Sequence, residues 1–247
     1  MSKLILLRHG ESLWNQANLF TGWVDVDLSD KGIKEAERAG ELIKAEPDLS
    51  LRVAHTSVLQ RAIKTCQIVL DKAEISYLPV LRHWRLNERH YGSLQGLDKK
   101  QVANEYGQEQ LKAWRRGYRT PPPPLELTSP MHPRNDVRYK NVFPAALPSS
   151  ECLADVLDRM FPYFVDQIAP YLLDGHDVLV VAHGNSLRAL VKVLDNISDD
   201  EIAELDIPTG IPRLYNFDDS LNVKEARYLG DPDEIKRLAE AVKRQAG

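Results

Sequence analysis

Cysteine is scarce in this chain, with two residues, Cys66 and Cys152, among 247. Neither lies in a CxxC pair or at a metal-ligand spacing from histidine. A disulfide-stabilised secreted domain would carry more thiols in a shorter chain, so that class is excluded. Both cysteines fall in helical patterns of apolar residues, and we expect them to be small buried side chains.

Long apolar runs are missing as well. The opening run, Leu4–Leu7, has four residues and ends at Arg8, and the longest later run, Val178–Ala182, has five. A signal peptide needs at least about seven consecutive apolar residues, and a membrane-spanning helix needs about twenty. We therefore expect a cytoplasmic protein with no targeting segment and no membrane partner.

No excess of one charge sign marks the chain, because 32 Lys and Arg stand against 36 Asp and Glu, a formal net charge of −4. A nucleic-acid-binding surface needs clustered cations over a broad face, so we expect no nucleic-acid partner. The hydrophobic content of 43%, with 13 Gly and 15 Pro, excludes disordered and collagen-like chains. A small anionic ligand is compatible with this composition, because a pocket responds to local charge.

The first third of the chain alternates short apolar strands with amphipathic helices. Strands are predicted at Lys3–Arg8, Leu51–His55 and Tyr77–Leu81. Between them, Ser29 is predicted to cap a helix that runs to about Ala45, and Ser57 to cap a second helix. A β-α-β-α-β order requires right-handed crossovers and a mainly parallel sheet. We predict an α/β protein with three layers, α/β/α, in which an antiparallel edge strand completes a mainly parallel sheet.

Regular structure resumes near residue 151 and supplies that antiparallel edge. The predicted elements are a long helix, Glu151–Leu173, kinked near Pro162 and Pro170 and followed by Gly175; a strand, Asp177–Ala182; a helix, Ser186–Leu194; a short helix opened by a capping box, Ser198–Glu201; two antiparallel strands, Arg213–Phe217 and Val223–Leu229; and a final amphipathic helix opened by Asp231 and Pro232.

The segment between these regular parts, about residues 82–148, is irregular. Eight of the fifteen prolines lie between Pro121 and Pro148, and one helical piece is predicted at Lys99–Tyr106. A flexible linker between domains is one interpretation. An ordered insertion over a functional face is the other, and the aromatic and cationic flanks favour it. We expect residues 1–247 to form one domain that carries a lid insertion at about 82–148.

Two short motifs resemble each other across the chain. Leu6–Ser12 and Val181–Ser186 both read as a strand, then His-Gly, a polar residue and Ser. In a parallel sheet, His9 and His183 would both lie at carboxyl ends of strands, where open α/β sheets bind ligands. Two imidazoles from distant positions are therefore predicted to face one pocket.

Cations and hydrogen-bond donors accompany these histidines. Arg8 adjoins His9, and Arg61 begins the helix after the second strand, at the same edge of the sheet. An arginine fork suits phosphate oxygens, and helix N-termini near Ser57 and Ser186 would add positive dipole ends. The loop after the first strand supplies further donors, which are Ser12, Asn15, Thr21 and the Gly22 amide. Together these residues predict an anion site, most economically a phosphate site.

The two histidines allow two other interpretations. His9 and His183 with Glu11 and Glu88 could bind a metal ion, but no HxH or HExxH spacing occurs and neighbouring arginines would repel a divalent cation. The histidines could also be plain core residues, but packing alone does not account for two matched His-Gly turns with paired arginines. We expect no metal cofactor.

A phosphate site lined by imidazole suggests covalent chemistry. A neutral imidazole nitrogen can attack phosphorus in line and hold the phosphoryl group, which divides one transfer into two steps. A general acid must then protonate the departing oxygen. Glu88, in the segment Leu86–Gly92 after the third strand, is the candidate for that role.

Five blocks of the sequence carry a close resemblance to a known family. In this order, and with the proline-rich insertion present, they resemble the 2,3-bisphosphoglycerate-dependent phosphoglycerate mutases of the histidine phosphatase superfamily. The resemblance runs from Lys3 to about Ala241. The blocks are Leu7–Ser12, Phe20–Trp23, Asn87–Gly92, Trp114–Gly117 and His183–Ser186.

The resemblance implies a role for each catalytic position. His9 would be the phosphorylated nucleophile, Glu88 the proton donor and acceptor, and His183 a stabiliser of the transition state, while Arg8 and Arg61 would hold the transferring phosphoryl group. The implied ligand-binding positions, besides those five residues, are Gly10, Glu11, Ser12, Asn15, Thr21, Gly22, Arg89, His90, Tyr91, Lys99, Arg115, Arg116, Gly184 and Asn185.

The implied activity is the metal-independent interconversion of 2- and 3-phosphoglycerate in glycolysis and gluconeogenesis, an isomerase primed by 2,3-bisphosphoglycerate. The family is commonly a homodimer, sometimes a tetramer, and its C-terminal tail, here Lys236–Gly247, commonly covers the active site. A phosphomonoesterase or a bisphosphoglycerate synthase/phosphatase of the same superfamily is the alternative enzyme. A binding protein that senses phosphorylated metabolites is a third alternative.

A lid would separate the mutase from the phosphatase, because a phosphohistidine serves a mutase only if water attacks it slowly. Residues Arg89–Arg119 are predicted to exclude water and to bind the carboxylate and second phosphate through Lys99, Arg115 and Arg116. The segment Arg82–Arg119 holds nine Lys and Arg against four Asp and Glu, so it carries +5 while the rest of the chain carries −9. The acidic average thus hides one cationic segment.

Overall fold

The computed structural model describes residues 1–233 and 235–237. One sheet of six strands runs through it in the order β3-β2-β4-β1-β5-β6. The four strands β3, β2, β4 and β1 are parallel, and β5 and β6 continue the sheet antiparallel. The strands are β1 (Ser2–Arg8), β2 (Leu51–Thr56), β3 (Val80–Arg82), β4 (Asp177–Ala182), β5 (Arg213–Phe217) and β6 (Val223–Tyr228).

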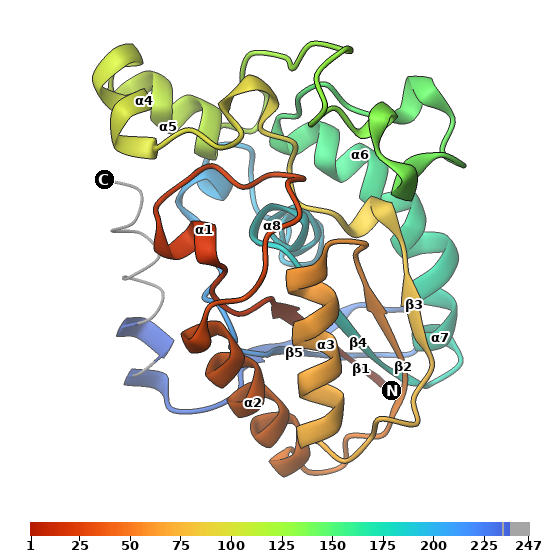
Figure 1. The fold of residues 1–247 in the computed structure, drawn as a ribbon. Coiled ribbons are helices and arrows are strands. Elements are labelled where there is room, and N and C mark those ends of the chain that lie inside the picture. The colour runs from red at the N-terminus through yellow and green to blue at the C-terminus, as the bar shows by residue number, and fades with distance from the viewer. Residues whose placement is uncertain (234, 238–247) are drawn as a thin grey trace.

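Helices cover both faces of the sheet and make the three-layer α/β/α fold that the sequence predicts (Figure 1). Alternate residues of β1 point to opposite faces, so Ile5 and Leu7 pack under α2 (Asp30–Ala45) and α3 (Gln60–Lys72). Leu4 and Leu6 pack on the other face, against residues of α6 (Leu153–Tyr163), α7 (Ala169–Leu173) and α8 (Gly184–Leu194). The central strands β1 and β4 are thus apolar on both faces, as buried parallel strands require.

Most predicted elements are confirmed, and three need correction. Ser29 caps α2 as predicted, but α3 begins at Gln60, and Ser57 caps no helix. The third strand lies at Val80–Arg82, slightly later than predicted, because 77–79 form a turn and an entry to the strand. The long predicted helix is divided by a π-helical turn, Phe164–Ile168, next to its two prolines, which remove backbone donors.

The end of the chain is described in part. Residues 232, 233 and 235–237 are helical, in line with the final helix predicted from Asp231-Pro232. The rest of that helix and most of the tail expected over the active site, Lys236–Gly247, lie outside the described residues.

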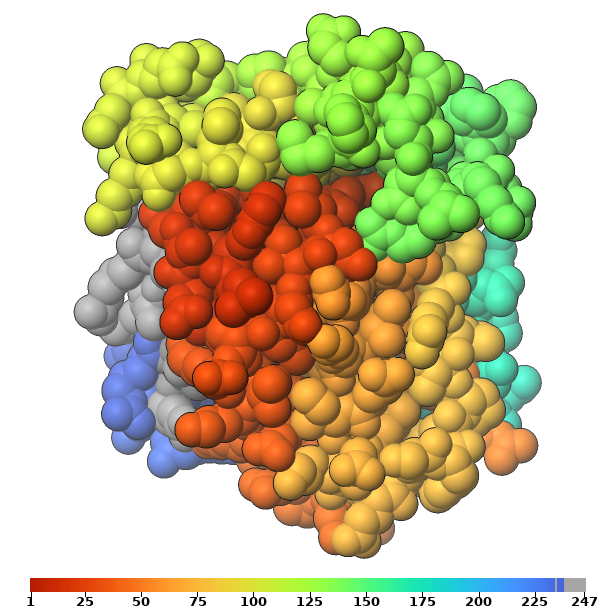
Figure 2. Space-filling model, in the orientation of Figure 1, coloured from red at the N-terminus to blue at the C-terminus, as the bar shows by residue number. Residues whose placement is uncertain are grey.

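The insertion rises above the carboxyl ends of the parallel strands and forms the top of the molecule (Figures 1 and 2). Its main elements are two helices, α4 (Lys99–Tyr106) and α5 (Gln108–Arg116), followed by short 3₁₀ turns, Pro133–Asn135, Val137–Tyr139 and Pro144–Ala146. Further 3₁₀ turns lie at Trp84–Leu86, Gly92–Leu94 and Glu201–Glu204, and a one-turn helix, α1, at Leu13–Gln16. The two helices share a small core of their own with the loop after β1, made of Phe20, Leu94, Val102, Ala103, Leu111 and Trp114.

Two further properties follow from the helices. Cys66 in α3 and Cys152 before α6 are both buried and unpaired, as expected from the sequence. Among the described helices, none is long and apolar enough to cross a membrane.

Candidate active site

The two His-Gly turns meet at one edge of the sheet. Strands β1 and β4 pair in parallel, with Arg8 opposite Ala182, and the His9 amide donates to the Ala182 carbonyl at 3.0 Å. The rings of His9 and His183 then lie 4.9 Å apart between centroids, edge to face at 63°. Both side chains are buried. The juxtaposition predicted from the repeated motif is therefore present.

The backbone fixes the tautomer of His9. Its Nδ1 lies 2.7 Å from the Gly10 carbonyl oxygen, and a carbonyl only accepts, so Nδ1 carries the proton. The lone pair is therefore on Nε2, which receives the Nε–H of Arg61 at 3.3 Å. Arg61 is itself held by the carbonyls of Gly22, at 2.7 Å, and Val24, at 3.0 Å. The nitrogen that faces the cations is the one able to act as a nucleophile.

Both imidazoles are kept neutral by their surroundings. Burial lowers the pKa of His9 well below its usual value of 6.5, and the positive charges of Arg61 and Arg8 lower it further. Burial likewise lowers the pKa of His183, with smaller contributions from Arg61, His9, Arg159 and Arg8. Each ring at neutral pH is thus free of a proton on one nitrogen, the form that can attack phosphorus.

Ser57 has a role that its sequence did not indicate. Its hydroxyl forms a hydrogen bond of 2.7 Å with Nε2 of His183 and accepts the Leu59 amide at 3.1 Å. Because this hydroxyl is fixed by the backbone of the loop before α3, it orients the His183 ring. Nδ1 of His183 is buried and has no hydrogen-bond partner within the described chain.

Glu88 approaches the same space from the segment after β3. Its Oε1 accepts the backbone amides of Arg89, at 2.8 Å, and Asn185, at 3.0 Å. Its own carbonyl accepts the Trp23 indole N–H and, at 2.8 Å, Nη2 of Arg159 from helix α6. The second carboxylate oxygen, Oε2, is directed past Gly184, where a Cβ would lie 3.7 Å from it. One oxygen thus anchors the side chain, and the other is available for proton transfer.

Some donors at the cavity have no acceptor among the described residues. Arg8 donates from Nη1 to the Ile207 carbonyl at 2.8 Å, while its buried Nε has no partner there. The buried hydroxyl of Thr21 has no acceptor in the described part of the chain either. Gly184 lets the guanidinium come close, because a Cβ there would be 3.4 Å from Nε and Cζ of Arg8. Unsatisfied buried donors on cationic groups are what an anion would complete.

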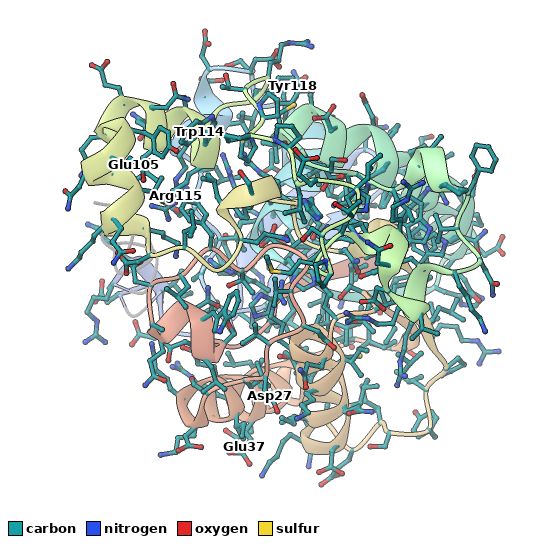
Figure 3. The ribbon with its side chains drawn as sticks, turned by 45° about the horizontal axis from the view of Figure 1, so that its top comes forward. Asp27, Glu37, Glu105, Trp114, Arg115 and Tyr118 are labelled. Carbon is teal, nitrogen blue, oxygen red and sulfur yellow. The ribbon has the colours of Figure 1, made fainter. Side chains whose placement is uncertain are left out.

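The insertion supplies the opposite wall of the cavity with three cations. Lys99 opens helix α4, and Arg115 and Arg116 close helix α5 (Figure 3 labels Arg115). Burial lowers the pKa of Lys99 to about 7, with Arg115 and Arg8 adding to the shift. Burial also lowers the pKa of Arg115 to about 10. Binding of an anion would lower the electrostatic free energy that it costs to hold these positive charges close together.

Eighteen residues line the cavity, and most of the predicted site residues are among them. The lining residues are Arg8, His9, Asn15, Leu19, Phe20, Thr21, Gly22, Arg61, Glu88, Tyr91, Lys99, Arg115, Arg116, Gly184, Asn185, Arg188, Asp206 and Ile207. His183, expected to face the same cavity, is not in the lining, and its ring instead contacts the His9 ring edge to face.

Five of the predicted binding residues do not line the cavity and instead support it. Glu11 accepts Ser29 and Lys31 and so ties its loop to helix α2. A Cβ on Gly10 would lie 2.1 Å from the Gly32 carbonyl oxygen, which makes glycine necessary there. The other three are Ser12, which caps helix α1, Arg89, which donates to Trp114 and Asn185, and His90, whose amide donates to Glu151.

Two charged lining residues could not be predicted from the motifs. Arg188, one turn into α8, donates to Oδ1 of Asn185 at 2.9 Å, and burial lowers its pKa to about 9. Asp206 pairs with Arg116 at 2.6 Å. The sequence could have indicated Arg188 as a site residue, because it lies three residues after Asn185 and therefore on the same face of the helix. No sequence pattern indicates Asp206 as a site residue, because a loop brings it to the site.

The arrangement suits an anion, with the unprotonated Nε2 of His9 at one end of the cavity. Six Arg and Lys side chains face two carboxylates across the cavity, and the histidines are neutral. Among the described residues, no group of three or more His, Cys, Asp or Glu is placed to hold a metal ion. A phosphoryl group beside Nε2 of His9 would have arginine donors around it and a carboxylate within reach of its leaving oxygen.

Comparison with known proteins agrees with this chemistry. The sequence model described as histidine phosphatase superfamily (branch 1) matches residues 4–136. Among solved structures, a mycobacterial glucosyl-3-phosphoglycerate phosphatase in complex with VO3 is 22% identical, with 92% of this chain and 96% of that chain covered and a TM-score of 0.68. The α-ribazole phosphatase of Shigella flexneri is 22% identical over 93% and 96% of the two chains, with a TM-score of 0.64. The product of an open reading frame of Mycobacterium tuberculosis is 26% identical over 93% and 97%, with a TM-score of 0.63.

Proposed function

This chain belongs to the histidine phosphatase superfamily, and within it we propose that the chain is a 2,3-bisphosphoglycerate-dependent phosphoglycerate mutase. It would interconvert 2- and 3-phosphoglycerate through a phosphorylated His9. The observation that carries the proposal is the cationic wall formed by Lys99, Arg115 and Arg116 opposite His9. A cavity with cations at both ends suits a small substrate that bears a second anionic group.

His9 would take the phosphoryl group. Nε2 attacks phosphorus in line while Arg8 and Arg61 neutralise the charge on the phosphoryl oxygens. The new bond is N–P, the bond that breaks is that between phosphorus and the substrate oxygen, and Nδ1 keeps its proton on the Gly10 carbonyl. His183, fixed by Ser57 and in edge-to-face contact with His9, would stabilise the transition state from beside the nucleophile.

Glu88 would act as the general acid and then as the general base. Its free oxygen, protonated, gives a proton to the departing substrate oxygen, and the resulting carboxylate takes a proton from the hydroxyl that attacks the phosphorylated His9. Because the acceptor can be the other hydroxyl of the same glycerate skeleton, two such steps move the phosphate between positions 2 and 3. The amides of Arg89 and Asn185 hold the carboxylate in place through both steps.

The priming compound, 2,3-bisphosphoglycerate, fits the donors of the cavity. The unpartnered Arg8 Nε and Thr21 hydroxyl would hold the phosphate near His9, and Lys99, Arg115 and Arg116 the more distant anionic groups. When bound, it supplies the phosphoryl group that His9 must carry before the first turnover. We propose that no metal takes part, that the protein is cytoplasmic and that it forms a homodimer.

A phosphomonoesterase is the second candidate, and the structural neighbours favour it. Two of those neighbours are phosphatases, a glucosyl-3-phosphoglycerate phosphatase and an α-ribazole phosphatase. On the same scaffold, a phosphatase results when water reaches the phosphorylated histidine before a second hydroxyl does. The position of the insertion over His9 favours the mutase.

The deciding experiment measures both activities in one preparation. With 3-phosphoglycerate and a trace of 2,3-bisphosphoglycerate, a mutase forms 2-phosphoglycerate faster than it releases inorganic phosphate, and a chelator leaves the rate unchanged. Phosphate release in excess of isomerisation would establish the phosphatase. Loss of activity in chelator would require a metal and contradict the mechanism above.

A further inference from the structure

One carboxylate stands where an anion site has no evident need of it. Of the two acidic side chains in the cavity lining, Glu88 has a place in the proposed proton transfer, but Asp206 lies at the other end, among the cations. Its Oδ1 is 2.6 Å from Nη1 of Arg116, and the side chains of the pair are 10% and 13% exposed. A fixed negative charge there competes directly with any anion that enters.

Asp206 acts on more than Arg116. Its charge also stabilises the charged forms of Arg8, Arg115 and Arg188, which come from strand β1 and helices α5 and α8. The chain next to it touches two of the walls, because Leu205 accepts Arg116 at 3.4 Å and Ile207 accepts Arg8 at 2.8 Å. The loop that carries Asp206 therefore connects the insertion with the phosphoryl end of the site.

We propose that Asp206 is a specificity-determining residue that acts as a built-in counter-anion and limits how much negative charge the cavity accepts. It neutralises part of the cation cluster in the free protein. An entering ligand must then offer anionic groups that pair better with Arg116 than Asp206 does. Ligands with more charge are opposed more strongly, so the residue favours singly phosphorylated over multiply phosphorylated ligands and hastens release of the latter.

The inference rests on the anion site of the proposed function and holds for a mutase or a phosphatase alike. Its test therefore uses inorganic anions, whose binding requires neither activity. Orthophosphate and pyrophosphate differ in charge, and calorimetric titration gives the dissociation constant of each.

Asp206→Asn is the principal variant, because the amide oxygen can still accept from Arg116 while the charge is removed. We expect pyrophosphate to bind roughly ten-fold more tightly and orthophosphate about three-fold more tightly, since the more highly charged anion gains more. Asp206→Glu, which restores the charge, should bind both anions like the wild-type protein. Glu204→Gln is the matched control, because it removes one negative charge two residues away, from a carboxylate 58% exposed and paired with Lys112.

A second pair of variants tests the same idea without altering Asp206. Arg115→Gln and Arg116→Gln each remove one cation, but only the second leaves Asp206 without its ion pair. We expect Arg116→Gln to weaken pyrophosphate binding several-fold more than Arg115→Gln does. Equal losses, or no tightening in a folded Asp206→Asn protein, or equal tightening in Glu204→Gln, would overturn the proposal and leave Asp206 as a structural anchor for helix α5.

Discussion

The floor and the roof of the cavity are built in different ways. The floor, defined as His9, His183, Arg61 and Arg8, extends from strands β1 and β4 and helix α3, over the two large cores of the sheet. The roof, defined as Lys99, Arg115 and Arg116, stands on helices α4 and α5, whose core has six buried residues. Much more apolar surface thus fixes the floor than the roof.

The hydrogen bonds and ion pairs also hold the floor more firmly than the roof. Arg61 in the floor is held by two backbone carbonyls, and His9 by a third. In the roof, the described residues give Lys99 one long hydrogen bond, 3.5 Å to Asn18. They give Arg116 an ion pair with Asp206 and a long bond of 3.4 Å to the Leu205 carbonyl. Backbone carbonyls have no side-chain rotamers, so they hold a bound side chain in one position. In an ion pair, an entering anion can replace the carboxylate partner. The floor is therefore suited to chemistry and the roof to choosing the ligand.

The largest expected difference between floor and roof is for His9→Ala, which removes the proposed nucleophile. We expect phosphoryl transfer to fall by about 10⁴-fold or more, because no other group takes over covalent catalysis. Incubation with 2,3-bisphosphoglycerate followed by mass spectrometry should show a phosphorylated wild-type protein and an unmodified variant. His176→Ala, exposed just before β4, is the matched control and should be phosphorylated normally. Phosphorylation that persists in His9→Ala would make His183 the nucleophile.

A smaller loss is expected for Glu88→Gln, which keeps the hydrogen bonds of Oε1 but cannot give a proton. We expect roughly 10²- to 10⁴-fold slower transfer from phosphoglycerate. With p-nitrophenyl phosphate, whose leaving group needs no acid, the loss should be much smaller. Glu105→Gln, on the exposed side of α4 (Figure 3), controls for the change in charge. Equal losses with both substrates would mean that Glu88 has a role other than proton transfer.

The floor could be predicted from the sequence, and the reason is local. A buried parallel strand leaves a short apolar run, and His-Gly directly after two such runs places both rings at one edge of the sheet. Ser57 shows the limit of that approach. A serine four residues before Arg61 suggests a helix cap, yet its hydroxyl instead bonds to His183, 126 residues away, which no local pattern can indicate.

The roof could be predicted only in part. The cationic segment and the helix Lys99–Tyr106 are predicted from the sequence, and the structure adds that Asp98 caps this helix by accepting the amides of Lys100 and Gln101. The resemblance to a family then supplied Arg115 and Arg116. Asp206 and Arg188 could not be predicted from either, because a loop and a helix from the distant C-terminal third bring them to the cavity.

The roof itself is tested by Arg115→Gln. We expect the KM for 3-phosphoglycerate to rise about 10- to 100-fold, as one charge-assisted contact is lost, and hydrolysis of p-nitrophenyl phosphate to change much less. The ratio of phosphate release to isomerisation should also rise, since a looser roof admits water. Lys112→Gln on the same helix, exposed and paired with Glu204, is the matched control. An equal loss with both substrates would mean that Arg115 takes part in phosphoryl transfer itself, and the distinction between a catalytic floor and a ligand-selecting roof would not hold.

The smallest effect is expected in the pH dependence of binding, through Lys99. Its pKa in the free protein is lowered to about 7, chiefly by burial. A bound anion favours the charged ammonium and raises that pKa, so binding takes up a proton above pH 7. Affinity for 3-phosphoglycerate should therefore fall by roughly ten-fold as the pH rises from 7 to 9, where the ligand's own charge is nearly constant.

Titration calorimetry in two buffers of different ionisation enthalpy measures that proton uptake directly. Lys99→Met should bind more weakly at pH 7, with a flatter pH profile and less proton uptake, whereas Lys100→Met, at the exposed neighbouring position, should keep the wild-type profile. The floor histidines cannot produce the same dependence, because burial and nearby arginines hold their pKa values well below 6.5 and leave them neutral throughout this range. A profile unchanged in Lys99→Met would show that Lys99 already carries its full charge in the free protein.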